Sequence, residues 1–213
     1  VDPNDVVAEY GADTLRVYIL FMGDYGSAAP WSESSMRGCK RFLERVAALT
    51  DKATGHGVTA ALESAFHKTV KKVSADIEEM KFNTAIAAMM TLLNDIDAAG
   101  ALTVDELGTL TRLLCPFAPH LCEEIWEKIG GAGFCSLAPF PTYDEAKTVD
   151  SMVEIAVQIN GKLRGVVMCP KDATKEEALG LAKADEKVAA ALEGKTLIKE
   201  IVVPGKIVNL VVR

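Results

Sequence analysis

The chain has 213 residues, of which 49% are hydrophobic and 25% are charged, and its formal net charge is −7. These values are ordinary for a folded globular protein and exclude a disordered or collagen-like chain. They also argue against a free-standing nucleic-acid binder, because such proteins are usually basic overall.

The charge is divided unevenly along the sequence. Up to residue 150 there are 13 Lys and Arg against 22 Asp and Glu, whereas the residues after it carry 10 against 8. We therefore expect the isolated chain to bind RNA poorly. Any RNA contact must come from local cationic patches that are held in place by further parts of the protein.

Cysteine and histidine give no sign of a metal site. The five cysteines are odd in number and never spaced Cys-x-x-Cys, which argues against a zinc site and a disulfide framework and indicates buried, reduced thiols. The three histidines lack a second ligand at a metal spacing. Because the sequence starts without Met and shows no signal peptide or membrane-spanning run, we expect a piece of a longer cytoplasmic protein that does not bind membranes.

The sequence begins with two short helical patterns. Asp2 precedes Pro3, and proline suits the first turn because it lacks the donor that a helix start leaves unpaired. Gly11 is expected to end this helix. Asp13 is expected to cap the second helix.

A loop is expected over residues 23–30. Ser32 or Ser34 is then expected to cap a third helix that runs to about residue 54. The outward face of this helix carries four cations at spacings of three and four residues: Arg37, Lys40, Arg41 and Arg45.

Four further helical patterns follow before residue 130. One covers about residues 60–80, Asn83 is expected to cap the next, and Thr103 with Glu106 forms a capping box for the third. The last starts at Pro119. Apolar residues recur at helical spacing, so residues 1–130 predict an up-and-down helical bundle.

The rest of the sequence changes character. Residues 131–151 contain prolines and an acidic pair and predict a linker or a wrapping tail. Residues 152–213 predict a hairpin, two helices and a second hairpin, with a capping box at Thr174 and Glu177 and an N-cap at Asp185. The expected fold is therefore mainly α, a helical bundle followed by a small α+β domain.

The first of these hairpins displays two cations beside its turn. Apolar and polar residues alternate over 153–159, and Asn160-Gly161 supplies the two positive-φ positions of a tight turn. Lys162 and Arg164 are two residues apart, so we expect them on one face, from which they can reach a phosphate backbone. A solvated strand edge whose charges prevent aggregation explains the same pattern.

No catalytic motif is present in the sequence. It has no Gly-rich phosphate loop after a strand, no Gly-x-Ser-x-Gly elbow and no His-Glu-x-x-His. His120, Glu123 and Glu124 fall in the first turns of a helix, and we expect them to have structural roles, with the two carboxylates favoured by the helix dipole. We therefore expect no catalytic residues and no metal site.

Several short segments nevertheless occur together in one order. They are Tyr-Gly-Ala-Asp-Thr-Leu-Arg at 10–16, Ala-Pro-His at 118–120, Pro-Thr-Tyr-Asp at 141–144, Gln-Ile-Asn-Gly-Lys-Leu-Arg-Gly at 158–165 and Gly-Lys-Thr at 194–196. This series closely resembles the C-terminal third of bacterial leucyl-tRNA synthetases and extends over essentially all 213 residues. The start resembles the segment that follows the Lys-Met-Ser-Lys-Ser loop of that family.

The resemblance implies a role for each part. The bundle would match the family's anticodon-binding domain, which supports the tRNA body, and residues 152–213 would match the small domain that touches the outer corner of tRNA(Leu). The ATP-dependent ligase activity, with ATP and Mg²⁺, would belong to the catalytic and editing domains of the same chain. This piece would then need no cofactor, would be inactive alone and would act in a monomer.

The candidate tRNA-binding residues follow from the cationic patches. On the small domain they are Lys162, Arg164, Lys195, Lys199 and Lys206, and on the bundle they are Arg37, Lys40, Arg41 and Arg45. Ion pairing with a neighbouring helix explains the bundle cluster equally well. Two other identities remain open: a non-catalytic protein-interaction module, and the same region of a valine or isoleucine synthetase.

Overall fold

A computed structural model describes residues 1–23, 30–149, 152–171 and 173–213. Its contacts divide the chain into two compact units, Val1–Thr148 and Val149–Arg213, each with its own apolar core. Most of the loop expected over 23–30 lies outside the described residues, as do residues 150 and 151 at the end of the expected linker. The first unit is helical and the second combines helices with strands, so the expected fold class is confirmed.

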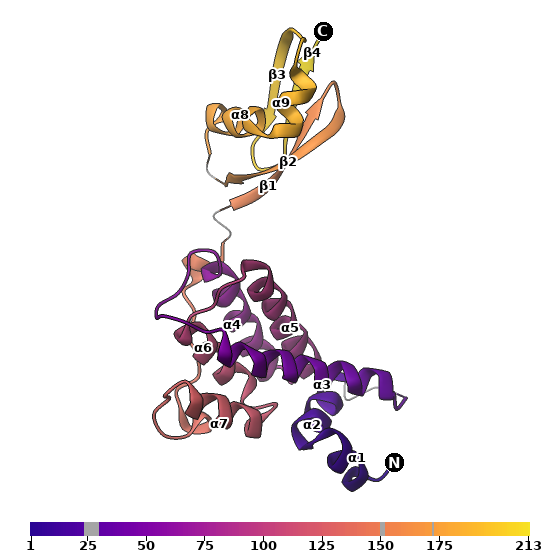
Figure 1. The fold of residues 1–213 in the computed structure, drawn as a ribbon, viewed down its shortest axis with the longest axis vertical. Helices are drawn as coiled ribbons and strands as arrows, with labels where there is room; N and C mark the ends of the chain where they lie inside the picture. The colour runs from indigo at the N-terminus through magenta and orange to yellow at the C-terminus, as the bar shows by residue number, and fades with distance from the viewer. Residues whose placement is uncertain (24–29, 150–151, 172) are drawn as a thin grey trace. The chain divides into compact units, whose positions relative to one another are not determined.

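The first unit consists of helices and three short 3₁₀ turns (Figure 1). The helices are α1 (Pro3–Tyr10), α2 (Ala12–Phe21), α3 (Glu33–Ala48), α4 (Glu63–Glu78), α5 (Phe82–Ala99), α6 (Val104–Leu114) and α7 (Pro119–Lys128). The 3₁₀ turns are η1 (Leu49–Asp51), η2 (Cys135–Leu137) and η3 (Glu145–Thr148). One continuous cluster of buried apolar side chains joins these helices, because the apolar stripe of each faces the others.

Several helix boundaries follow from local signals. The Ser32 side chain accepts a hydrogen bond from the Ser35 amide, and Thr103 with Glu106 forms the expected reciprocal capping box. The third helix ends at Ala48 and tightens into η1, so it stops short of residue 54. Bonds of the 3₁₀ type commonly close a helix end in this way.

Two expected N-caps are wrong. The helix α2 starts at Ala12, and the Asp13 carboxylate instead reaches α7, where it accepts a hydrogen bond from the Leu121 amide at 2.8 Å. Asp13 therefore caps a helix distant in sequence. The helix α5 starts at Phe82 without a side-chain cap, which leaves Asn83 inside its first turn.

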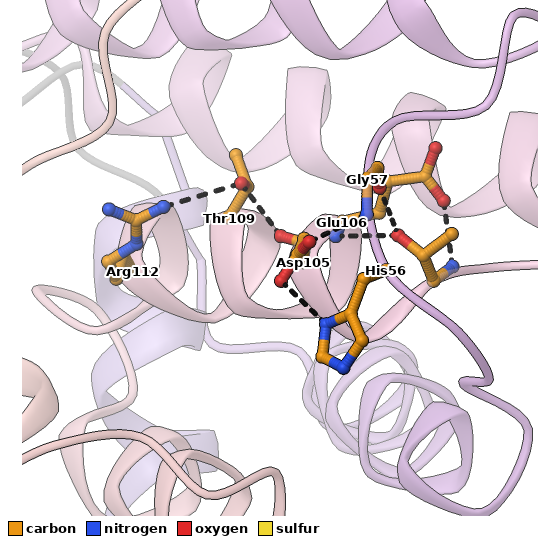
Figure 2. Close-up of polar contacts among 7 residues, drawn as sticks. His56, Gly57, Asp105, Glu106, Thr109 and Arg112 are labelled. Carbon is orange, nitrogen blue, oxygen red and sulfur yellow. Dashed lines mark hydrogen bonds and ion pairs between the residues drawn. The ribbon is translucent and has the colours of Figure 1, made fainter.

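The loop before α6 is fastened to the start of that helix. Figure 2 shows the Asp105 side chain directed toward His56 and Gly57. Its carboxylate accepts a hydrogen bond from the Gly57 amide at 2.6 Å and lies 3.3 Å from His56 Nδ1. The Gly57 hydrogen bond, followed by that of His56, holds the pKa of the Asp105 carboxyl below its usual value. Glu106 accepts from the Thr59 amide at 2.7 Å, so the cluster secures the loop to α6.

The segment after α7 lies against the bundle. The Asp144 amide donates to His67 Nδ1 at 3.0 Å, Lys147 pairs with Glu63 at 2.7 Å, and Glu145 pairs with Lys71. All three contacts reach α4. Where the sequence suggests a linker over 131–151, these contacts hold residues 144–147 on the first unit.

The second unit is a four-stranded sheet with two helices. Its elements are β1 (Met152–Ile159), β2 (Lys162–Pro170), α8 (Lys175–Ala184), α9 (Glu186–Leu192), β3 (Leu197–Val203) and β4 (Ile207–Val212). The strand order is β2-β1-β4-β3, with two antiparallel hairpins joined by a parallel β1–β4 pair. The expected series of hairpin, two helices and hairpin is present, as are the capping box at Thr174 and the N-cap at Asp185.

Both helices pack on the same face of this sheet (Figure 1). Alternate residues of the inner strands, such as Val157 and Val208, are completely buried under Ala182 of α8 and Val188 of α9. Gly165 of β2 lies where α9 begins. A Cβ atom there would stand 2.9 Å from Asp185 Oδ1 and 3.1 Å from a Val188 methyl carbon, so the close approach of helix and strand requires glycine.

Candidate nucleic-acid interface

The turn of the first hairpin is fixed from the neighbouring strand. Asn160 and Gly161 have φ values of 49° and 78°, as the expected tight turn requires. The Asn160 side chain also donates to the Val212 carbonyl at 3.0 Å and accepts from the Val212 amide at 2.9 Å. The Gly161 amide donates to Asn209 Oδ1 at 3.2 Å. The turn beside the cations is therefore held by β4, a contact that no local sequence signal indicates.

Lys162 and Arg164 stand beside this turn, but not in the simple alternation that the spacing predicts. Ile159 pairs with Lys162 and Gln158 with Leu163, whereas Val157 pairs with Gly165. Arg164 is therefore the additional residue of a β-bulge, which interrupts the alternation of faces. The bulge removes the regular alternation from which a shared face was inferred, so that inference stays a prediction. Both side chains are exposed, without a hydrogen bond or ion pair in the described part of the chain.

The three other cations of the second unit differ in their surroundings. Lys195 Nζ donates to the Ala191 carbonyl at 2.8 Å and so supplies a donor to a carbonyl in the last turn of α9. Lys199 pairs in register with Val211, and Lys206 lies in the turn between β3 and β4. Both are exposed, and neither side chain has a polar partner among the described residues. Their role in binding tRNA stays a prediction.

The cationic face of α3 is partly neutralised within the first unit. Arg45 donates to Asp97 at 2.7 Å, and Arg37 lies 3.8 Å from Glu33 one turn away. Lys40 stands over the Tyr10 ring at 5.7 Å. Arg41 is exposed and makes no such contact in the described residues. Ion pairing across helices thus explains Arg45, and an RNA role of this face stays a prediction.

The polar residues at the start of α7 hold neighbouring backbone. His120 Nδ1 lies 2.8 Å from Asp13, and the Glu123 carboxylate accepts from the Cys135 amide at 2.7 Å and the Ser136 amide at 2.9 Å. Burial would raise the pKa of Glu123, but these hydrogen bonds keep it below its usual value. These contacts give both residues structural roles.

The cysteines are buried and reduced, as expected. Burial raises the pKa of the Cys39 thiol to about 11 and that of Cys135 to about 12. Thiolate is the reactive form, so these groups are poor nucleophiles near neutral pH. No group of three or more His, Cys, Asp or Glu residues in the described ranges could hold a metal ion.

A pocket of about 290 Å³ lies between α2, α6 and the segment after α7. Two arginines line it. Arg16 donates to the Pro116 carbonyl at 3.0 Å and Arg112 to the Pro139 carbonyl at 3.1 Å. Both guanidinium groups satisfy backbone carbonyls, which gives them a structural use.

A family model matches a segment that extends from the first unit into the second. The model of the anticodon-binding domain of tRNA ligase matches residues 60–179, more than half of the chain. The chain belongs to this anticodon-binding domain family. The match begins near α4 and ends in α8, so it includes β2, the strand that carries Lys162 and Arg164.

Two curated proteins match the chain over its whole length. It is 46% identical over 214 residues to a leucine–tRNA ligase of Alkaliphilus oremlandii and 44% identical over 219 residues to that of Bdellovibrio bacteriovorus. All of this chain is covered in both cases, but only 27% and 28% of those proteins. The resemblance seen in the motifs is confirmed, and the chain spans little more than a quarter of these relatives.

A solved structure is similar to this chain over its whole length. It is the crystal structure of a ternary complex of an Agrobacterium radiobacter LeuRS with tRNA and LeuAMS, with a TM-score of 0.67 and 32% identity. The match covers 100% of this chain and 30% of that one. In the ranges described here, no helix is both long and apolar enough to span a bilayer.

Proposed function

We propose that this chain is the tRNA-supporting part of an ATP-dependent leucine–tRNA ligase. The carrying observation is the 46% identity to a leucine–tRNA ligase over the full length of the chain. Its partners are tRNA(Leu) and the catalytic and editing domains of the same cytoplasmic, monomeric enzyme. ATP and Mg²⁺ act in those other domains, so this piece needs no cofactor and has no ligase activity alone.

The second unit supplies the cations best suited to RNA. Lys162, Arg164, Lys199 and Lys206 are exposed and have no anionic partner in the described residues. A folded tRNA is recognised mainly through its shape, phosphates and 2′-hydroxyls, and side chains of this kind can bind phosphates without reading sequence. On α3, Arg41 is likewise exposed and has no anionic partner in the described residues.

The test uses the full-length ligase with Lys162→Glu and Arg164→Glu. Charging of tRNA(Leu) should weaken, whereas activation of leucine, measured by ATP–pyrophosphate exchange, should be unchanged. Lys183→Glu is the control, because Lys183 already pairs with Glu200 at 2.6 Å. Unchanged charging in the double variant would contradict an RNA role for the hairpin, and equal loss of both steps would assign it a role in folding.

A protein-interaction module is the second candidate, and one observation favours it. Phe134 and Leu137 are 65% and 80% exposed in the segment after α7. These two side chains lie in one short segment, and exposed apolar side chains that gather into a patch mark protein contacts. Binding of a protein that does not weaken with added salt, together with an absence of tRNA binding, would support this candidate.

A further inference from the structure

Three of the five buried thiols gather in one place in the first unit. Cys115 follows the last residue of α6, Cys122 lies in α7, and Cys135 is the first residue of η2. The turn η2 packs against both helices, and all three side chains belong to the core of this unit. A buried thiol usually acts as a small apolar side chain, but neighbouring thiols can also be oxidised to a disulfide.

Two of these three thiols contact each other directly. The Cys135 thiol donates a hydrogen bond to the sulfur of Cys115. A disulfide requires a close approach of both sulfur atoms, and a hydrogen bond between the thiols already makes them neighbours. Cys122 lies near both, but its interaction with them is coulombic. The pair that the fold brings together is therefore Cys115 and Cys135.

The same pair can be reached from solvent. Both cysteines line the pocket of about 290 Å³ described above. They are 5% and 3% exposed, whereas Cys122 is 0% exposed. Hydrogen peroxide is similar in size to water, which occupies about 30 Å³ per molecule in the liquid, so this pocket is large enough to admit it.

The surroundings of the pair give the two thiols different roles. Burial raises the pKa of both, to about 12 for Cys135. The hydrogen bond from Cys135 acts in the opposite sense on Cys115 and favours its thiolate. Since the thiolate is the nucleophile, Cys115 is the thiol that attacks an oxidant first. The guanidinium group of Arg112, which lines the same pocket, favours the thiolate of Cys135 in the second step.

We propose that Cys115 and Cys135 form a reversible disulfide when the protein meets a peroxide. The Cys115 sulfur attacks one oxygen of hydrogen peroxide, the O–O bond breaks, and a sulfenic acid and one water molecule form. The Cys135 sulfur then attacks the sulfenic sulfur, the S–O bond breaks, and the S–S bond forms with release of a second water molecule. Overall, two thiols lose two electrons and two protons, and the peroxide is reduced to water. This site does not depend on the proposed tRNA-supporting function.

The disulfide would fasten η2 to the end of α6. The Glu123 carboxylate already holds the Cys135 and Ser136 amides. A covalent link to Cys115 restrains the same residues against local opening. It also closes a loop that contains α7, and such a link stabilises the folded state mainly because it restricts the unfolded chain.

The test uses the full-length protein, which is treated with hydrogen peroxide and then alkylated in denaturant without a reductant. Peptide mapping by mass spectrometry should find Cys115 linked to Cys135 with the loss of two hydrogen atoms, and dithiothreitol should reverse the link. Digestion with trypsin and chymotrypsin separates Cys115 from Cys122, because Phe117 and Leu121 lie between them.

The internal control is Cys39 of α3. It is 1% exposed and its pKa is raised to about 11 by burial, so it matches the pair in its environment but has no second thiol as a hydrogen-bond partner among the described residues. Cys39 should therefore be recovered as the alkylated free thiol from the same oxidised sample.

A second measurement reports on the restraint that the link imposes. Amide hydrogen exchange at Cys135 and Ser136 should slow by at least about tenfold in the oxidised protein, because the segment opens less often. Cys115→Ser should abolish both the link and the slower exchange, whereas Cys122→Ala should keep both.

Three results would overturn the proposal. The first is that Cys115 and Cys135 both stay free under conditions that fully oxidise an exposed cysteine in a reference peptide. The second is a sulfinic acid at Cys115 beside a free Cys135. The third is a link that joins Cys122 to either of the other two.

Discussion

The close approach of β2 to α9 at Gly165 gives a direct test of the fold of the second unit. Replacement of Gly165 by Ala places a Cβ atom 2.9 Å from Asp185 Oδ1 and 3.1 Å from the Val188 methyl carbon. The carboxylate cannot simply move away, because this oxygen accepts from the Lys187 and Val188 amides at 3.1 and 3.0 Å. The new methyl group therefore strains the N-cap of α9.

The magnitude follows from the two contacts. Loss of an N-cap costs about 1 kcal/mol, and an added carbon in a packed core costs about 1–3 kcal/mol. We expect Gly165→Ala to destabilise the second unit by about 2 kcal/mol. Gly180→Ala is the opposite control, since Gly180 lies inside α8 with open space around it and should gain about 1 kcal/mol from helix propensity.

The assay must report on each unit separately, because a chain with two cores need not unfold in one step. Both tryptophans, Trp31 and Trp126, lie in the first unit. Their fluorescence during urea unfolding should be unaffected by Gly165→Ala. Amide hydrogen exchange in β1 and β4 should accelerate by about 30-fold, the factor that corresponds to about 2 kcal/mol.

Two results would refute this reasoning. Unchanged amide hydrogen exchange in β1 and β4 would mean that α9 shifts to accommodate the methyl group and keeps its N-cap. An equal shift of the tryptophan transition would mean that the two units unfold together, so that the loss could not be assigned to the contact at Gly165.

Two further predictions concern the hairpin turn and the loop before α6. Asn160→Gly keeps the positive φ but removes both side-chain hydrogen bonds to Val212. Hydrogen exchange of the Val212 amide should therefore accelerate by about tenfold, for a loss of about 1.4 kcal/mol. An unchanged exchange rate would show that these hydrogen bonds are dispensable. The pKa of Asp105 is lowered by folding, so its contribution to stability is present above the usual value of 3.8 and is lost as the pH falls through the lower, folded value. The stability of Asp105→Asn should therefore fall less between pH 5 and pH 2 than that of the unchanged chain, measured by urea unfolding at each pH, and parallel curves would contradict this.

Local signals predicted much of the fold because their physics is local. A capping box such as Thr103 with Glu106 joins groups three residues apart, and the Asn160-Gly161 turn depends on its own φ values. Both are therefore readable without knowledge of tertiary contacts. The same holds for the helical period of the bundle, which reflects burial of one face of each helix.

The sequence was insufficient where distant residues compete for a side chain or alter a register. Asp13 has the form of an N-cap for α2, but it satisfies an amide of α7 more than a hundred residues away. The spacing of Lys162 and Arg164 predicts one face only if the strand is regular, and the bulge depends on pairing with β1. Lys195 is an exposed cation, as the sequence indicates, but its hydrogen bond to the Ala191 carbonyl at the end of α9 is visible only in the folded chain.

The parallel pairing of β1 with β4 has a consequence for synthesis of the protein. The strand made last in this unit is an inner strand, and it provides the partner groups for the Asn160 side chain and the Gly161 amide. Residue 212 must therefore have left the ribosome before the sheet can close. Until then, the edge of β1 that pairs with β4 has no partner strand. Premature termination within 207–212 would leave the β1–β2 hairpin and an unpaired β3. An isolated two-stranded hairpin is only marginally stable in water, so quality-control proteases would encounter an open sheet.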